Sequence, residues 1–342
     1  MEYKGKYTAF DPTQVKTYPV STRTNKVKFS DLHFPEEVLK TKYEVGEGVE
    51  KRLEKLAKDI VEFRKQGKPV VMLTGGHMIK NGLSPLVADM VKKDMITLFA
   101  GNGATSIHDF ELGLIGETSE YVPQALEKGE FGMAFEFNYI NAAVTVGNSM
   151  KLGYGESVGR MFNDEGFRKK VQEVLRVEED VEFLHSEICL QSICYQNDVP
   201  FTVHAGIGTD VLDQHEFFDG ADKGGCSGRD FLIYTEEITK FTEGGIIMNI
   251  GSAVTGPEVF LKAASMAGNI GKVPDNIITA NFDLRPYDPK VFSNEEEVGY
   301  YYRDQKSIVT RVPQAYNGKG YYISGNQLAT LPMLYQKIIE LI

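Results

Sequence analysis

Glycines and histidines gather directly after several short apolar runs of this chain. The richest example follows residues 96–100, where Gly101-Asn102-Gly103 opens a polar segment that carries His108, Asp109 and Glu111. A strand that ends in a glycine turn and continues as a helix leaves backbone N–H groups unpaired, and such groups can bind an anion. Glycine also lets the backbone approach a ligand closely. The run falls one residue short of the pattern G-x-G-x-x-G, because serine holds the last position.

Four further apolar runs end in similar loops. These loops contain Gly75-Gly76-His77, the stretch from His204 to Asp210 with Gly206 and Gly208, Gly251-Ser252, and Asn281-Phe282-Asp283. The carboxyl ends of parallel strands lie at one edge of a sheet, where ligands bind at the point at which the strand order reverses. The needs of a tight strand–helix turn explain any one of these glycine loops. Five such loops in one chain predict a shared ligand crevice.

Four of the six histidines lie at or just after the ends of these runs. They are His77, His108, His204 and His215. Imidazole titrates near neutral pH and can act as a general base, although a histidine in a loop can also simply bond backbone groups. We take His108 and His204 as candidate bases, with Asp109 to orient an imidazole and Asp210 to hold a cationic group. No H-x-H or H-E-x-x-H spacing supports the converging ligands that zinc needs, so we assign no metal ligand.

A polar, glycine-rich segment from Asp219 to Gly225 is predicted to be a loop over the site or a surface turn. Its carboxylates, Asp219 and Asp222, are candidates to contact ribose hydroxyls or a cationic substrate. Lys80 and Lys223 are the lysines nearest to the predicted crevice, and we expect both to be solvated.

The composition excludes several classes of protein. The chain has 342 residues and a net charge of −11, which argues against a surface for duplex nucleic acid. No apolar run approaches the roughly 20 residues that span a bilayer, and the first residues form no signal-peptide core. Three cysteines, Cys189, Cys194 and Cys226, have no metal or redox spacing. These features predict a cytoplasmic protein in a reducing setting.

Hydrophobic periodicity predicts alternating strands and helices. Near-continuous apolar runs predict strands at residues 68–74, 96–100, 201–204, 245–250 and 277–280, with an edge strand at 320–325. Amphipathic patterns predict helices at residues 49–66, 84–93, 181–195 and 229–241, one opening at 257, and one at 331–342. This alternation predicts an α/β fold, a Rossmann-like open parallel sheet with helices on both faces. We expect an N-terminal arm (1–45) and a single domain (46–342) with a helical insertion at about 117–198.

Four strand–loop–helix units resemble the deoxyhypusine-synthase-like NAD/FAD-binding superfamily. They begin at Thr74-Gly-Gly-His, Ala100-Gly-Asn-Gly-Ala-Thr-Ser-Ile-His-Asp-Phe-Glu, Val203-His-Ala-Gly-Ile-Gly-Thr-Asp and Asn249-Ile-Gly-Ser-Ala-Val-Thr-Gly-Pro-Glu. Residues 101–111 are similar to the nucleotide-binding domain of archaeal ornithine cyclodeaminases, which read Gly-Asn-…-His-Asp-Ile-Glu there. The likeness covers roughly residues 65–330, and the whole chain also resembles a group of bacterial proteins of this fold.

The resemblance implies a bound NAD and a homo-oligomer with sites near subunit interfaces. It also implies that Gly101, Asn102, His108 and Asp109 line the nicotinamide nucleotide. Deoxyhypusine synthase carries its reactive lysine in a Trp-Gly-Lys motif, and this chain has no tryptophan. We therefore do not carry that activity over.

Together these observations predict an enzyme with NAD as a resident redox group, acting on a small amine or amino acid by elimination, deamination or transfer. The acidic balance suits a cationic substrate. The predicted cofactor-binding residues are Gly75, Gly76, Gly101, Asn102, Gly103, Gly206, Gly208, Gly251, Ser252 and Asp283. Two alternatives remain open: a metal-dependent hydrolase built on the same loops, and a nucleotide-binding protein without turnover. No acidic residue follows the second strand to read a ribose, so NAD is not separated from NADP or FAD.

Overall fold

Six parallel strands form the centre of the molecule, which a computed structural model describes from residue 3 to residue 342. The strands are β2 (Val70–Thr74), β3 (Leu98–Gly101), β5 (Phe201–Val203), β6 (Ile246–Ile250), β7 (Ile278–Asp283) and β8 (Lys319–Ser324). They lie side by side in the order β5-β3-β2-β6-β7-β8. Counted along the chain, this is the doubly wound Rossmann order 3-2-1-4-5-6, whose direction reverses between β2 and β6. The predicted Rossmann-like sheet is confirmed.

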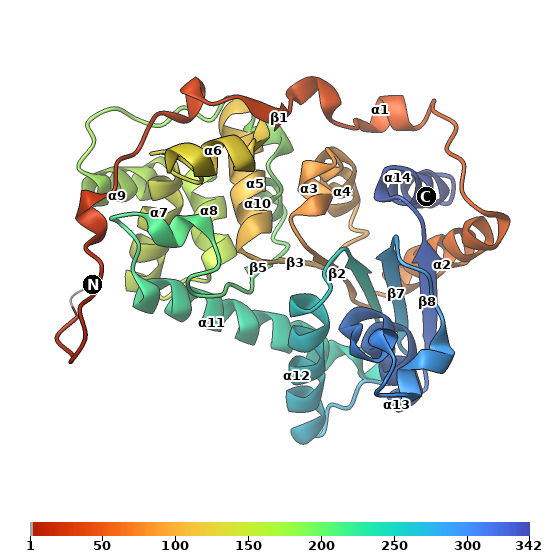
Figure 1. Cartoon of the computed structure of the whole chain (residues 1–342). Coiled ribbons are helices and arrows are strands. Elements are labelled where there is room, and N and C mark those ends of the chain that lie inside the picture. Colours follow the sequence, from red (N-terminus) through yellow and green to blue (C-terminus); the bar gives the residue numbers. More distant parts are fainter. Residues whose placement is uncertain (1–2) are drawn as a thin grey trace.

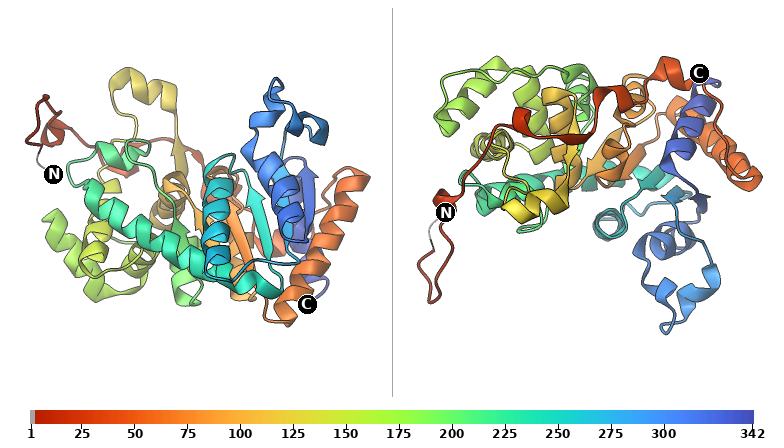
Figure 2. Two further views of the ribbon diagram at one scale, coloured as in Figure 1. Left: turned by 90° about the horizontal axis from the view of Figure 1, so that it is seen from below. Right: turned by 45° about the horizontal axis from the view of Figure 1, so that its top comes forward.

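Helices cover both faces of the sheet (Figure 1, Figure 2). On one face α2 (Glu47–Lys65), α4 (Ser84–Lys92) and α14 (Gln327–Ile339) pack over Val70 and Met72. On the other face α11 (Gly220–Ile238) and α12 (Thr255–Asn269) pack over Val71 and Leu73. Successive strand residues point to opposite faces, so a strand buried on both sides must be apolar throughout. That is why short continuous apolar runs marked the strands correctly.

The segment between β3 and β5 is largely helical. It contains α5 (Gly103–Ile115), β4 (Thr118–Glu120), α6 (Val122–Lys128), α7 (Phe137–Ser149), α8 (Tyr154–Asn163), α9 (Glu165–Leu175) and α10 (Leu190–Gln196). The short helices α1 (Pro35–Val38), α3 (His77–Lys80) and α13 (Val312–Ala315) lie elsewhere. A π-helical stretch, η9, covers Asp304–Arg311. Short 3-10 turns occur at Pro12–Gln14, Val20–Thr22, Phe29–Asp31, Ser186–Ile188, Val211–Gln214, Thr239–Glu243, Pro289–Ser293 and Val298–Tyr301.

The N-terminal arm is attached to this helical segment. Its strand β1 (Asn25–Val27) pairs antiparallel with β4, placing Asn25 opposite Glu120. The backbone of Tyr18 bonds the segment before α7, because its N–H donates to Met133 O at 3.1 Å. Figure 1 shows the arm crossing the helical segment before the chain turns into α2. The arm thereby brings residues 18–27 next to α5 and β4.

Three sequence predictions about elements were wrong. The segment from Asp219 to Gly225 is not a loop: Asp219 accepts from the backbone N–H of Ala221 at 2.7 Å and so caps α11, whose first turns the glycines occupy. The helix expected from residue 181 begins only at Leu190. The strand expected to end at residue 280 continues to Asp283, because Asn281 pairs with Asn249 of β6 inside the sheet.

Among residues 3–342, no helix combines the length and the apolar character that crossing a membrane requires.

Candidate functional site

The reversal of strand order brings the turns after β2 and β6 into contact. A Cβ atom on Gly75 would lie 2.7 Å from the carbonyl oxygen of Gly251, so this approach requires glycine. Gly251 itself has φ of +65°, which disfavours other residues. The buried Asn249 donates from Nδ2 to Ser252 O at 2.9 Å and fixes the second turn. Val254, at the N-cap of α12, contributes no side-chain cap, but Ser252 caps this helix end by accepting from the backbone N–H of Gly256 at 2.9 Å.

The N-terminus of α5 is already occupied by the protein's own groups. Asn102 caps the helix by accepting from Thr105 N at 3.0 Å. A Cβ atom on Gly103 would lie 2.0 Å from Asp210 Oδ2, so the Asp210 carboxylate faces the first turn of α5. Lys223 binds Asp210 at 2.8 Å and Asp213 at 2.6 Å. The expectation of a solvated Lys223 was wrong, because its side chain is only 3% exposed between these two carboxylates.

His108 stands on α5 with one ring nitrogen bound and the other free. Its Nδ1 lies 2.8 Å from Thr118 Oγ1 and 3.3 Å from Glu111 Oε2. Thr118 donates its hydroxyl hydrogen to Glu111, and a carboxylate only accepts, so Nδ1 carries the ring proton. In the neutral ring Nε2 then presents a lone pair, and no hydrogen bond joins it to another of residues 3–342. The ring borders the turn after β2, since a Cβ on Gly76 would lie 3.0 Å from His108 Cδ2.

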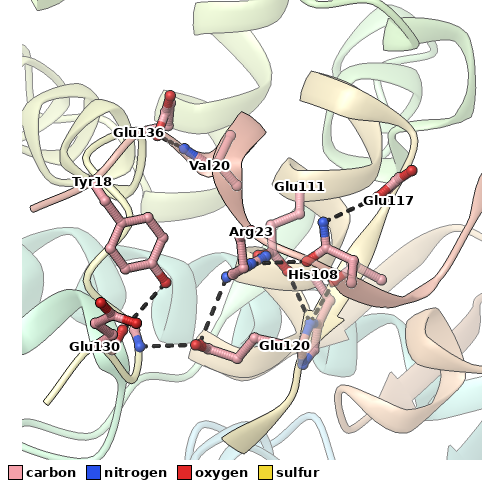
Figure 3. Close-up of polar contacts among 12 residues, drawn as sticks. Tyr18, Val20, Arg23, His108, Glu111, Glu117, Glu120, Glu130 and Glu136 are labelled. Carbon is pink, nitrogen blue, oxygen red and sulfur yellow. Dashed lines mark hydrogen bonds and ion pairs between the residues drawn. The ribbon is translucent and has the colours of Figure 1, made fainter. Parts of the chain in front are cut away.

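Glu111 links His108 to an arginine of the N-terminal arm. Arg23 forms an ion pair with Glu111, and both side chains are buried, Arg23 being 7% exposed (Figure 3). Burial alone would raise the pKa of Glu111, but the hydrogen bond from His108 and the charge of Arg23 outweigh it and lower the pKa to about 2. Glu111 is therefore ionised at neutral pH and holds the Nδ1–H form of His108.

A second carboxylate, Glu120 of β4, faces the same arginine. Its Oε1 accepts from Gly132 N at 3.0 Å and lies 3.6 Å from Arg23 Nη1. Its other oxygen, Oε2, is buried without a hydrogen-bond partner among the described residues. Burial raises the pKa of Glu120 in spite of the nearby Arg23. Arg23 thus lies beside two carboxylates, and its single positive charge can neutralise only one of them.

These groups surround a cavity of about 250 Å³, which we call the inner cavity. Its walls include His108, Glu111, Arg23, Asp210 and the half-buried Lys80, with Phe131 and Phe137 as apolar cover. The volume lies just below the range of roughly 300–1,000 Å³ typical of ligand pockets, which suits a small substrate. The inner cavity thus joins a proton acceptor, several charges and apolar walls beside the turn after β2.

Other predicted residues lie outside the inner cavity. Asp109 points to the N-terminus of α10, where it accepts from Leu190 N at 2.7 Å and Gln191 N at 2.8 Å. Burial raises its pKa to about 6. His204 lies at the end of β5 with its ring against Tyr234, and burial lowers its pKa to about 4. Neither Asp109 nor His204 lines the inner cavity, and their predicted catalytic roles stay predictions.

The remaining predicted loop residues are dispersed. Gly206 and Gly208 lie in an exposed loop, where Gly208 N donates to Asp213. Asp283 ends β7 on the far side of β6 and binds Arg285 Nε at 2.8 Å. His215 contacts Gly132 O at 2.8 Å.

Two further possibilities raised by the sequence concern Asp222 and a metal ion. Asp222 accepts from Thr145 and Asn148, which ties α11 to α7, and its contact with a ribose or a cationic substrate stays a prediction. Among residues 3–342, no group of three or more His, Cys, Asp or Glu side chains is arranged to hold a metal ion.

Sequence reasoning missed Glu111 and Thr118 as partners of His108. It also missed Arg23, which pairs with Glu111, and Glu120, which lies beside Arg23. One signal was available for Glu111, because residues three apart share a helix face. Glu111 follows His108 by three positions, whereas the neighbouring Asp109 points elsewhere. Arg23 is 88 residues from Glu111 in a segment without periodicity, so no local pattern indicated it.

Known proteins are similar to this chain only over part of their length and at low sequence identity or low structural similarity. No family model matches the chain. A stretch of 106 residues, 30% of this chain, is 31% identical to ornithine cyclodeaminase from Methanothermobacter thermautotrophicus and covers 25% of that protein. Among solved structures, ArgZ, an arginine dihydrolase from the ornithine–ammonia cycle in cyanobacteria, matches 88% of this chain and 33% of its own, with a TM-score of 0.49 and 17% identity. AgrE in a ternary complex with ornithine and NAD+ has a TM-score of 0.46 and 14% identity over 88% of this chain and 34% of its own. The chain therefore spans a quarter to a third of the length of these proteins.

Proposed function

We propose that this chain is an enzyme that holds NAD at the turns after β2 and β6 and acts on a small amine or amino acid in the inner cavity. The observation that carries the proposal is the position of His108. Its unpartnered Nε2 belongs to a ring that touches the Gly76 turn and also lines the inner cavity. A base between a nucleotide turn and a substrate cavity is what proton removal during a redox step requires.

The turns offer a fitting cradle for a dinucleotide. Gly75 lets the two turns approach each other, and Ser252, which accepts from Gly256 N at 2.9 Å, lies at the N-terminus of α12, where the helix dipole favours an anion. Since Asp210 already faces the N-terminus of α5, we assign the pyrophosphate to Gly75, Gly76, Gly251 and Ser252. A nicotinamide ring held at this edge supplies reversible acceptance of a hydride. Gly101 and Asn102, at the end of the adjacent strand β3, stay candidates for the rest of the nucleotide.

The charges around the inner cavity favour a cationic substrate. Three carboxylates, Glu111, Glu120 and Asp210, line it together with two cations, Arg23 and Lys80. Asp210 shares Lys223 with Asp213, which adds one further charge of each sign behind the wall. The site is therefore one positive charge short, and a substrate ammonium group would supply it. The local identity to a protein named ornithine cyclodeaminase supports an amino-acid substrate with a basic side chain.

In this proposal the chain's own groups perform the proton transfers. His108 Nε2 takes a proton from the substrate amine or from the carbon next to it, while Glu111 and Thr118 hold the ring and stabilise its charged form. Phe131 and Phe137 exclude water from one side of the inner cavity. Bound NAD would supply the oxidation, and an elimination, a deamination or a transfer would then take place at the bond next to the oxidised carbon.

The first experiment is to denature freshly purified protein and to analyse the released nucleotides and metals together by mass spectrometry. We expect NAD at about one molecule per chain, the stoichiometry of a resident cofactor. Ornithine and other small amines are then added while absorbance at 340 nm is followed, and a transient rise is expected.

Each of the other outcomes points elsewhere. A divalent metal without nucleotide would support the hydrolase alternative, and bound NAD without any amine-dependent absorbance change would support a nucleotide-binding protein. Membership of the deoxyhypusine-synthase-like superfamily and a homo-oligomeric state, which light scattering would measure, belong to the same proposal.

A further inference from the structure

A second, larger cavity lies on the other side of Arg23 and Glu120. This outer cavity, of about 510 Å³, opens between residues 18–24 of the arm and helix α6. Tyr18 and Tyr121 form aromatic walls, and Gln124, Ala125 and Lys128 of α6 form the opposite side. Arg23 and Glu120 line both cavities, so they form the partition between them. The outer cavity has the size of a small-molecule site and borders the inner cavity without being part of it.

The partition contains an unsatisfied acceptor. The side chain of Glu120 is 9% exposed, and its Oε2 has no hydrogen-bond partner among the described residues. Figure 3 shows the Glu120 carboxylate reaching past Arg23 toward the side of Tyr18 and Glu130, where the outer cavity lies. A buried carboxylate oxygen without a donor is costly, and a ligand that donates to it removes that cost.

The charges nearby favour a cationic donor. Arg23 donates from Nη2 to Glu111 and from Nε to Asn25 at 2.8 Å, so only Nη1 faces Glu120, at 3.6 Å. Two buried carboxylates therefore share one guanidinium. An ammonium group is compact and carries three donors, so it fits a single carboxylate oxygen. Aromatic walls stabilise an ammonium group further through their π faces.

We propose that the outer cavity is a second binding site, separate from the inner cavity, for a small primary amine whose ammonium group binds Glu120 Oε2. The inner cavity and the outer cavity lie on opposite sides of the Arg23–Glu120 partition, and one ammonium group bound on the outer side supplies the positive charge that Glu120 lacks. This site rests on the cavity and on the unpartnered oxygen, and it does not require that NAD binds at the switch point.

The test uses the full chain, 1,4-diaminobutane as the probe and 1,4-butanediol as its neutral counterpart. A soaked crystal should show diamine nitrogen at about 3 Å from Glu120 Oε2 in the outer cavity. A ligand-observed NMR titration should show binding of the diamine and none of the diol. Diamine density confined to the inner cavity, or equal binding of the diol, would overturn the proposal.

Variants separate the two cavities. E120Q keeps an oxygen for Gly132 N while removing the charge, and it should weaken diamine binding at least tenfold. A125F fills the outer cavity without touching the inner one, and it should abolish binding there while leaving the content of released NAD unchanged. E127Q removes a carboxylate from the same helix outside the cavity and is the matched control. Unfolding temperatures establish that each variant folds, and wild-type affinity in both E120Q and A125F would contradict the proposal.

Discussion

The two halves of the sheet edge both contain an arginine paired with buried carboxylates, but the two networks differ in what else they hold. Beyond β2, β3 and β5, an arginine from the arm pairs with Glu111, and the chain of contacts ends on His108 with a free Nε2. Beyond β6, β7 and β8, Arg285 pairs with Asp283 and Asp304. There Asn281 joins Asn249 at 2.6 Å to Asp304, and Gln305 donates to Asp283 at 3.1 Å. Both halves neutralise buried carboxylates with an arginine, but in the first half the paired carboxylate also holds a histidine that lines a cavity.

The difference shows that polar character at a strand end does not by itself mark a catalytic site. In the second half most donors find an acceptor within the network, so the network stabilises the loops after β7. In the first half the network orients one ring and leaves one of its atoms unsatisfied. A hydrogen-bonding atom without a partner in a residue that lines a cavity, rather than polarity alone, distinguishes the first network from the second.

The largest expected effect concerns turnover. His108→Asn removes the basic Nε2 while keeping a polar side chain, and we expect kcat/KM to fall by about 10²–10⁴, the range of general-base catalysis. Tyr322→Phe in the second half removes a hydroxyl that donates to Arg285 O and accepts from Gln305 Nε2 at 3.1 Å, and it should leave kcat/KM within a few-fold. Steady-state assays on the amine identified at 340 nm measure both. Equal losses in the two variants would remove the functional distinction between the halves.

The next effect concerns stability. Arg23→Met leaves Glu111 and Glu120 buried without their cation, and we expect it to lower the free energy of unfolding by about 3–5 kcal/mol. Arg285→Met should cost only about 1 kcal/mol, because Arg285 is 32% exposed and solvent screens its pairs. Urea unfolding of both variants at pH 7 gives the comparison. A larger loss for Arg285→Met would show that the second network contributes more to folding than the first.

A third prediction concerns His204 and the way in which the free energy of unfolding depends on pH. Burial lowers the pKa of His204 to about 4, below the ordinary value of 6.5, so the folded state resists protonation there. Its contribution to stability is full above pH 6.5 and is lost as the pH falls toward 4, on the order of 3 kcal/mol. His204→Asn should remove that part of the acid-side loss, measured by urea unfolding at pH 7 and pH 4.5. An unchanged difference between the two pH values would mean that His204 does not stay neutral in the folded protein.

The smallest effect concerns the cradle at the switch point. Gly75→Ala places a Cβ 2.7 Å from Gly251 O, so the two turns must separate, and we expect NAD to bind about tenfold more weakly, or about 1.4 kcal/mol. Gly46→Ala meets no atom within 4 Å and is the matched control. Calorimetric titration with NAD after removal of endogenous nucleotide measures both variants. Unchanged affinity in Gly75→Ala would place the nucleotide elsewhere.

The sheet could be predicted from the sequence far better than the site. Strands buried on both faces require continuous apolar residues, so β2 and β6 were evident from their composition. Asn281 was assigned to a loop because a polar residue seldom occupies a central strand, and only its cross-strand partner Asn249 explains it. His108 was recognised from its position after a glycine turn. Arg23 could not be, because its role depends on β1 pairing with β4, a contact between segments remote in the chain.

The attachment of the arm has a consequence for the order in which function and fold are lost. The arm is held by fewer contacts than the sheet: the short β1–β4 ladder, the bonds of Tyr18 and Val20, the ion pairs of Arg23, and three buried side chains, Val20, Leu32 and Val38. The sheet is held by two large apolar cores. Segments with few buried contacts open at lower free energy than the whole domain. Release of the arm withdraws Arg23, so mild urea or brief proteolysis near residues 15–30 should inactivate the protein while its sheet and helices stay intact. The far-ultraviolet circular dichroism signal would then stay unchanged while the proposed activity is lost.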